Sequence, residues 1–395
     1  MTDEEKQPQE EKQPKERTRK RPRRSYGTGS VFERKGRKGK PFVAQIILEN
    51  GETRQTYYKT RKEAEDALNE MLYQQRHGTL TTGPKQTVAQ YLEYWLEIHR
   101  TTLKLSTYAL YRRQLDNHIL PELGHYQLQG LRADQVQAFY AKKQKEGISA
   151  RTLRNFHAIL SAAFKDAVRW RRLSYNVCDA VKLPRLNQRE RKPLDQEQAK
   201  RLLSVAKGSP LECLFTLALV TGMRIGELLA LHWSDINFEE KTLQVQHTVS
   251  LIQKLGYVET EPKTESSKRI IALPQIAIDA LKQHHTVQLE ARLKAGSQWK
   301  EQGLVFTNLL GGYLGHTKVR YFFNKLLNQA GLPHMRFHDL RHSAATILLS
   351  MGVNIKVVQE ILGHANISMT LDIYGHVLPS MQRNAMDGMD DLFGG

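Results

Sequence analysis

The segment PRLNQRERKP at Pro184–Pro193 divides the chain and limits what either side of it can form. It is polar and basic, and a proline bounds it at each end, so it can neither enter a core nor continue a helix. We therefore expect 184–193 to be an exposed linker. With 395 residues, the chain is also too long for one ordinary domain. A multidomain protein is predicted.

The charge is large and unevenly placed. The chain holds 59 Lys and Arg against 41 Asp and Glu, a net charge of +18, and sixteen of the basic residues fall within 15–62 against four Glu. Such an excess indicates a polyanionic partner, either nucleic acid or an anionic membrane. The longest near-apolar run, Leu214–Val220, is too short to span a membrane. No apolar signal segment occurs in residues 1–25. These features favour a cytoplasmic, nucleic-acid-binding protein without membrane contact.

The N-terminal part is predicted to be a disordered basic tail over 1–25 and a small sheet-plus-helix domain over 26–80. The expected elements are strands at Ser30–Arg34, Pro41–Leu48 and Thr53–Tyr58, a two-residue hairpin turn at Asn50–Gly51, and a helix Arg61–His77 capped by Thr60. Such a ribbon can enter a DNA groove. The candidate DNA contacts are Arg19, Lys20, Arg21, Arg23, Arg24, Arg34, Lys35, Arg37 and Lys38. The alternative is a basic tail that is merely solvated.

Residues 86–183 are predicted to be all-helical. The expected helices run from Val88 to Ile98, from a Ser106 cap to Pro121, over Arg132–Glu146, and from a Ser149 cap through Val168. Few acids accompany the basic residues of these helices, so we favour a DNA-facing surface over a solvated helix face. Candidate contacts here are Arg112, Arg113, Arg151 and Arg154.

Residues 194–380 are predicted to form a mixed α+β domain, mainly helical, followed by a tail over 381–395. Helices are expected at 195–206, 211–220, 275–295, 317–330, 339–350 and 354–361, and strands at Thr242–Thr248, Tyr257–Thr260 and Lys268–Leu273. The two cysteines, Cys178 and Cys213, are too few for a disulfide framework and fit no zinc spacing.

Four segments of this domain hold the candidates for chemistry. They carry Arg224 with Glu227, Lys263 near an expected hairpin tip, His338 with Arg341, and His364 with Tyr374. Each alone has a plain structural explanation, such as an ion pair, a solvated lysine or a capping histidine. His338 and His342 have metal-ligand spacing, but no third ligand is evident, so no metal is expected. Tyr313 and Tyr321 are competing nucleophiles, and Tyr321, beside Phe322, is expected in the core.

Taken in order, these segments resemble the tyrosine recombinases, in particular the integrases of phages and integrative conjugative elements. The shared pattern is R-x-x-E, then Lys near a β-turn, then H-x-x-R, L-G-H and Tyr. Lys254 and Lys268 lie near Lys263, but the spacing to Ser267-Lys268-Arg269 favours Lys263. The resemblance implies an arm-type DNA-binding domain at 26–80, a core-binding domain at 86–183 and a catalytic domain at 194–380.

The residue types suit the chemistry that the resemblance implies. A phenol with a pKa near 10 needs nearby cations to ionise at pH 7, and two arginines match a phosphodiester transition state. The implied roles are Tyr374 as nucleophile, Arg224 and Arg341 as phosphate clamp, and His364 as donor to a non-bridging oxygen. His338 assists proton transfer, Lys263 protonates the leaving 5′-oxygen, and Glu227 supports the basic residues. Side chains supply the cations and the phosphotyrosine stores the bond energy, so no cofactor is expected.

The implied partners are double-stranded DNA, at core and arm-type attachment sites, and the protein itself as a tetramer on synapsed DNA. An excisionase and a host DNA-bending protein are further candidates. Two alternatives stay open: a DNA-binding regulator without catalysis, and a type IB-like topoisomerase.

Overall fold

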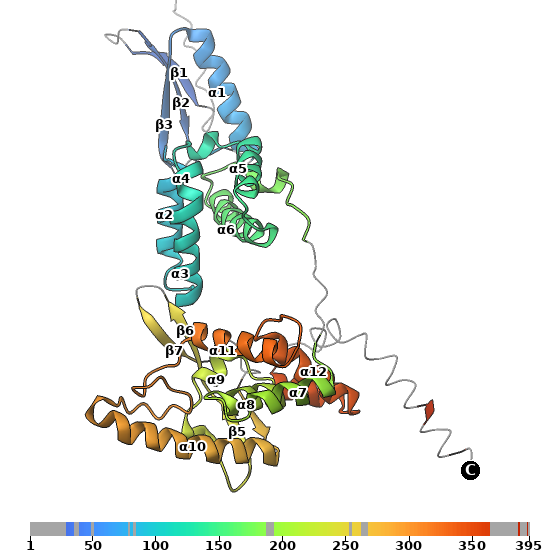
Figure 1. Ribbon diagram of the computed structural model, residues 1–395. Helices are drawn as coiled ribbons and strands as arrows, with labels where there is room; N and C mark the ends of the chain where they lie inside the picture. The colour runs from blue at the N-terminus through green and yellow to red at the C-terminus, as the bar shows by residue number, and fades with distance from the viewer. Residues whose placement is uncertain are drawn as a thin grey trace, which may run out of the picture. The chain divides into compact units, whose positions relative to one another are not determined.

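The computed structural model describes residues 29–34, 39–48, 51–77, 80–81, 84–186, 193–252, 255–261, 268–363, 386–387 and 393 (Figure 1). The chain forms two compact units. The first holds Met1–Thr102 and Tyr111–Leu186, and the second holds Leu103–Leu110 and Asn187–Gly395. The main boundary thus falls within the proline-bounded segment.

An antiparallel three-stranded sheet opens the first unit. Strands β1 (Ser30–Glu33), β2 (Phe42–Ile47) and β3 (Thr53–Tyr58) pair in that order, and helix α1 (Arg61–Arg76) packs on them. The predicted cap at Thr60 is confirmed, and it forms a capping box with Glu63. The turn predicted at Asn50–Gly51 lies in part outside the described residues, because Asn50 is not among them. Beside it, Leu48 donates to the Glu52 carbonyl at 2.8 Å, and Gly51 adopts φ +82°.

The rest of the first unit is helical, as expected. Its helices are α2 (Val88–Ile98), α4 (Leu120–Leu123), α5 (Ala133–Lys145) and α6 (Ala150–Arg169). The unit boundary falls within α3 (Leu105–Gln114), whose part from Tyr111 onward belongs to the first unit. A π-helical turn over Leu115–Ile119 joins α3 to α4. The helix therefore starts before Ser106 and passes Pro121, contrary to the prediction. Pro121 has no amide to donate, and the π-helical turn lies directly before it in the chain.

The second unit is built around helix α8, whose Leu214, Phe215 and Leu217 are fully buried. Helices α10 and α12 both pack against α8 (Figure 1). The helices of this unit are α7 (Gln196–Ala206), α8 (Glu212–Thr221), α9 (Ile225–Leu229), α10 (Gln275–Ala295), α11 (His316–Gln329), α12 (Asp339–Ser350) and α13 (Ile355–Leu362). All six helices expected here lie within two residues of their predicted bounds.

The strands of the second unit pair differently from the prediction. The expected strand Thr242–Thr248 is two strands, β5 (Thr242–Val245) and β6 (Thr248–Ile252). β5 pairs with β4 (Ile236–Asn237) and β8 (Arg269–Ala272), whereas β6 pairs with β7 (Gly256–Thr260). The strands that flank Lys263, β7 and β8, therefore belong to different sheets. The expected hairpin between them is wrong.

The proline-bounded segment ends on a buried anchor. Leu194, only 1% exposed, donates its amide to Ser343 Oγ at 2.9 Å, and Ser343 Oγ donates to the Asp339 carbonyl at 3.0 Å. Gln196 Nε2 also donates to Ser350 Oγ at 3.2 Å. The chain thus enters the second unit on helix α12.

Candidate active site

The first site segment is a tight junction between α8 and α9. Gly222 ends α8 at φ +61°, and a Cβ there would lie 2.5 Å from Leu362 Cδ2, so both conformation and space require glycine. Arg224 then caps α9, and its backbone amide donates to Glu227 Oε2 at 3.0 Å. The R-x-x-E spacing is therefore a capping arrangement as well as an ion pair.

Glu227 is a buried carboxylate shared by two arginines. Arg224 Nη1 lies 2.6 Å from Glu227 Oε1, and Arg269 Nη2 lies 3.0 Å from Oε2. Burial alone would raise the pKa of Glu227, but the charges of Arg269 and Arg224 and their hydrogen bonds outweigh it and hold the pKa below its usual value. The carboxylate is therefore ionised at neutral pH and fixes both guanidinium groups.

Helix α12 brings Arg341 and His338 to the same junction. Arg341 is buried, and its Nη1 donates to the Gly222 carbonyl at 2.9 Å. His338, at the N-cap of α12, keeps an exposed side. Packing around the ring and the charge of Arg341 lower the pKa of His338, and Arg224 contributes in the same direction. The imidazole is therefore neutral at pH 7.

The end of α13 completes the junction. Arg224 Nη2 donates to the Gly363 carbonyl at 3.4 Å, and Gly363 ends α13 at φ +66°. His364 is the next residue along the chain. Lys263, His364 and Tyr374 lie outside the described residues. The structure thus brings together Arg224, Glu227, His338 and Arg341, from segments distant in the sequence.

Arg269 is the residue of this junction that sequence reasoning did not select. It appeared only as the end of Ser267-Lys268-Arg269, used to choose among lysines. Its side chain is 7% exposed and joins β8 to Glu227 and to the Ile361 carbonyl. The sequence did offer one signal for Arg269, namely a basic residue at the start of a strand a few residues after Lys263.

The candidate DNA contacts of the first unit are not equivalent. Arg112 is ion-paired with Glu93 at 2.7 Å and with Asp116 at 3.4 Å, so the expected shortage of acids is wrong there. Arg154 donates to the Pro184 carbonyl, and Arg34 donates to Tyr57 Oη at 3.2 Å. Arg113 and Arg151 are exposed. Arg19, Lys20, Arg21, Arg23, Arg24, Lys35, Arg37 and Lys38 lie outside the described residues.

Helix α11 presents a basic face that the sequence did not reveal. Tyr321, expected in the core, is 66% exposed, because the helix buries Val319, Phe323 and Leu326 instead. Lys318, Arg320 and Lys325 are exposed with it, and the helix contains no acidic residue. The side chains share a face with Asn324, so the surface combines cations with an amide and a phenol.

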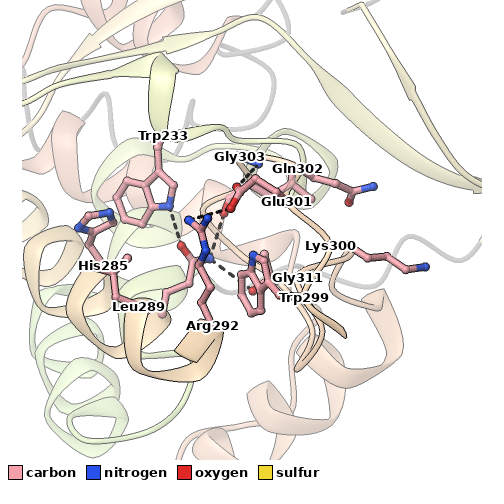
Figure 2. Close-up of a pocket in the computed structure, with 13 residues that line it drawn as sticks. Trp233, His285, Leu289, Arg292, Trp299, Lys300, Glu301, Gln302, Gly303 and Gly311 are labelled. Atoms are coloured by element: carbon pink, nitrogen blue, oxygen red, sulfur yellow. Dashed lines mark hydrogen bonds and ion pairs between the residues drawn. The ribbon is translucent and has the colours of Figure 1, made fainter. Parts of the chain in front are cut away.

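A small pocket lies elsewhere in the second unit, between α10 and the 299–311 segment (Figure 2). Trp233 Nε1 donates to Gln288 Oε1 at 2.7 Å, and Arg292 pairs with Glu301 at 2.8 Å. None of the predicted catalytic residues lines this pocket.

His338 and His342, the pair with metal-ligand spacing, lie edge to face with ring centroids 5.3 Å apart. Within the described ranges no cluster of three or more His, Cys, Asp or Glu side chains could hold a metal ion. Over the same residues, no helix has the length and apolarity needed to cross a membrane.

Two family models match the chain. The model described as the phage integrase family matches residues 192–381, and the phage integrase N-terminal SAM-like domain matches 87–144. A "tyrosine recombinase XerC-like" protein of Caldanaerobacter subterraneus is 36% identical over 366 residues, which cover 87% of this chain and 94% of the relative. The ICEBs1 integrase of Bacillus subtilis is 27% identical over 70% of this chain and 76% of the relative.

Solved structures show the same fold. The Tn1549 transposon integrase, in complex with a circular intermediate DNA, has a TM-score of 0.65 at 24% identity, covering 77% of this chain and 99% of that one. A lambda integrase dimer bound to a core site has a TM-score of 0.55 at 19% identity, covering 87% and 94%.

Proposed function

The chain belongs to the phage integrase family of tyrosine recombinases, enzymes that cut and rejoin DNA, and from this premise we propose that it integrates and excises a mobile element through a 3′-phosphotyrosine intermediate. The observation that supports this most is the convergence of Arg224, His338 and Arg341 at the end of α13, where the chain continues to His364.

The electrostatics of this junction suit phosphoryl transfer. Two guanidinium groups held by fixed partners can stabilise negative charge on the non-bridging oxygens without rearranging. A neutral His338 can accept the proton that the Tyr374 hydroxyl loses as it attacks. In this proposal Tyr374 attacks the phosphorus, His364 donates to a non-bridging oxygen, and Lys263 gives its proton to the leaving 5′-oxygen. Glu227 orients both arginines.

We assign the DNA-binding surfaces to both units. In the first unit the exposed Arg113 and Arg151 and the N-terminal sheet with Arg34 are the candidates. In the second, α11 offers Lys318, Arg320 and Lys325 beside Tyr321. Cations of this kind contact phosphates, whereas Asn324 has the donor and acceptor that read adenine.

The proposed partners follow from the activity. Recombination requires two DNA duplexes, so we infer self-assembly into a tetramer, as the lambda integrase forms on a Holliday junction. Core and arm-type attachment sites, an excisionase and a host DNA-bending protein belong to the same proposal. We place the protein in the bacterial cytoplasm, at the nucleoid.

The decisive experiment uses a nicked suicide duplex from the region flanking the gene that encodes the chain. Wild type and Tyr374→Phe are incubated with it in EDTA without ATP, and a denaturation-resistant protein–DNA adduct is scored. We expect an adduct with wild type only. Tight binding with no adduct would instead support a non-catalytic regulator. An adduct with no strand exchange between two sites would support a topoisomerase.

A further inference from the structure

Arg269 bridges two hydrogen-bond acceptors from different helices. Its Nε donates to the Ile361 carbonyl at 2.6 Å, and its Nη2 lies 3.0 Å from Glu227 Oε2. The two acceptors lie in different helices. Ile361 belongs to α13, which packs against β8, and Glu227 belongs to α9. A planar guanidinium can hold both at fixed angles, whereas an ammonium is a single point of charge.

The Glu227 carboxylate connects Arg269 to Arg224. The Glu227 side chain is 3% exposed, and each carboxylate oxygen is ion-paired with one arginine. Oε1 pairs with Arg224 and Oε2 pairs with Arg269. Oε2 also accepts the Arg224 backbone amide at 3.0 Å. A shift of Glu227 would therefore move the Arg224 side chain and backbone together.

The same pair of arginines reaches the last turn of α13. Arg269 donates a hydrogen bond to the Ile361 carbonyl, and Arg224 donates one to the Gly363 carbonyl. Carbonyls at a helix C-terminus lack partners within the helix and carry partial negative charge, so they favour cations. The last described residue before His364 is thus tied to Arg224, and the turn before it is tied to Arg269.

We propose that Arg269 is a positioning residue of the recombinase: its bond to the Ile361 carbonyl fixes the guanidinium, which sets Arg224 through Glu227. It does not touch the DNA phosphate itself. The inference rests on the proposed function, in which Arg224 binds that phosphate.

The test compares Arg269→Met, Arg269→Lys and the control Arg292→Met in the full chain. Arg292 is also ion-paired, to Glu301, but is 54% exposed and far less constrained. Single-turnover adduct formation on the nicked duplex is measured well below each variant's melting temperature, with DNA affinity measured in parallel. We expect about a 100-fold slower reaction for Arg269→Met, the size expected of a misplaced catalytic group, with affinity within about twofold. Arg269→Lys should recover less than tenfold.

Two further readouts separate positioning from simple stabilisation. Combining Arg269→Met with Glu227→Gln should add less than about threefold to the effect of Glu227→Gln alone, because both act through one carboxylate. In Arg269→Met the carboxylate loses its leading cation, so its pKa rises and the rate loss should deepen as pH falls from 7 to 5.

The outcomes are distinct. A wild type that binds the duplex but forms no adduct overturns the proposed function, and the inference with it. A wild-type adduct with full activity in Arg269→Lys overturns the inference alone, and does so even if Arg269→Met fails to fold. Additive losses in the double variant likewise assign Arg269 a structural role only.

Discussion

At the scale of single residues, an arginine can bind a DNA phosphate readily only if carboxylates of the protein do not already hold its guanidinium group. Arg112 holds Glu93 and Asp116, whereas Arg113, its neighbour on α3, is exposed. We predict that Arg113→Gln weakens DNA binding and lowers the salt dependence of log K by about one unit of slope. Arg112→Gln, the matched control, should change the slope by much less. Salt titrations of binding test this, and equal slopes for the two variants would contradict it.

His338 makes a prediction about pH. Packing and Arg341 lower the pKa of its imidazole, so the ring is neutral at pH 7 and takes up a proton only below its ordinary range near 6.5. Adduct formation by wild type should stay level from pH 8 to about 6.5 and decline below that. His338→Gln should be about 100-fold slower with that decline absent. A wild-type midpoint at pH 7 or higher would refute the assignment.

The site could be predicted from the sequence in part. Ordered spacing selected Arg224, Glu227, His338 and Arg341, which the structure brings together. The spacing could not reveal that Arg269 shares Glu227, because that contact depends on how β8 meets α9. Tyr321 was misjudged for a related reason. The apolar neighbour Phe322 indicates that the helix has a buried face, but it does not indicate whether Tyr321 lies on the buried or the exposed face.

At the scale of elements, close packing of α9 on β6 sets a limit on Gly226. A Cβ there would lie 2.6 Å from Thr248 Oγ1 and 2.9 Å from the Val249 carbonyl oxygen. We predict that Gly226→Ala lowers the free energy of unfolding by about 1–3 kcal/mol, as overpacking does. Gly130→Ala, whose Cβ would have its nearest atom at 3.7 Å, is the control. Denaturant unfolding of both variants measures this, and equal midpoints would be the contrary result.

Helices were predicted far better than strands, and the cause is physical. Helix bounds depend on local signals, such as the Thr60 cap and Gly222, which the sequence displays directly. Strand bounds depend on partners. The segment from Thr242 to Thr248 contains no proline or glycine to mark a break, yet β5 and β6 separate because one pairs with β8 and the other with β7.

At the scale of the whole molecule, the division into two units predicts where proteases cut. The segment between Leu186 and Pro193 carries Arg189 and Arg191, after which trypsin can cut, whereas Pro193 blocks cleavage after Lys192. Limited trypsin digestion should therefore yield a persistent C-terminal fragment that starts between residues 187 and 193, identified by N-terminal sequencing. Loss of the second unit before any such fragment accumulates would contradict the division.

The bond between Leu194 and Ser343 limits where chimaeras of such enzymes can be joined. Leu194 is bonded to Ser343, two residues from Arg341 on the same helix. A chimaera that borrows the DNA-binding half of a relative should therefore be joined upstream of Pro193. A junction placed even two residues later would exchange a contact of helix α12, which carries Arg341, along with the first unit. A change in target choice would then be confounded with a loss of activity.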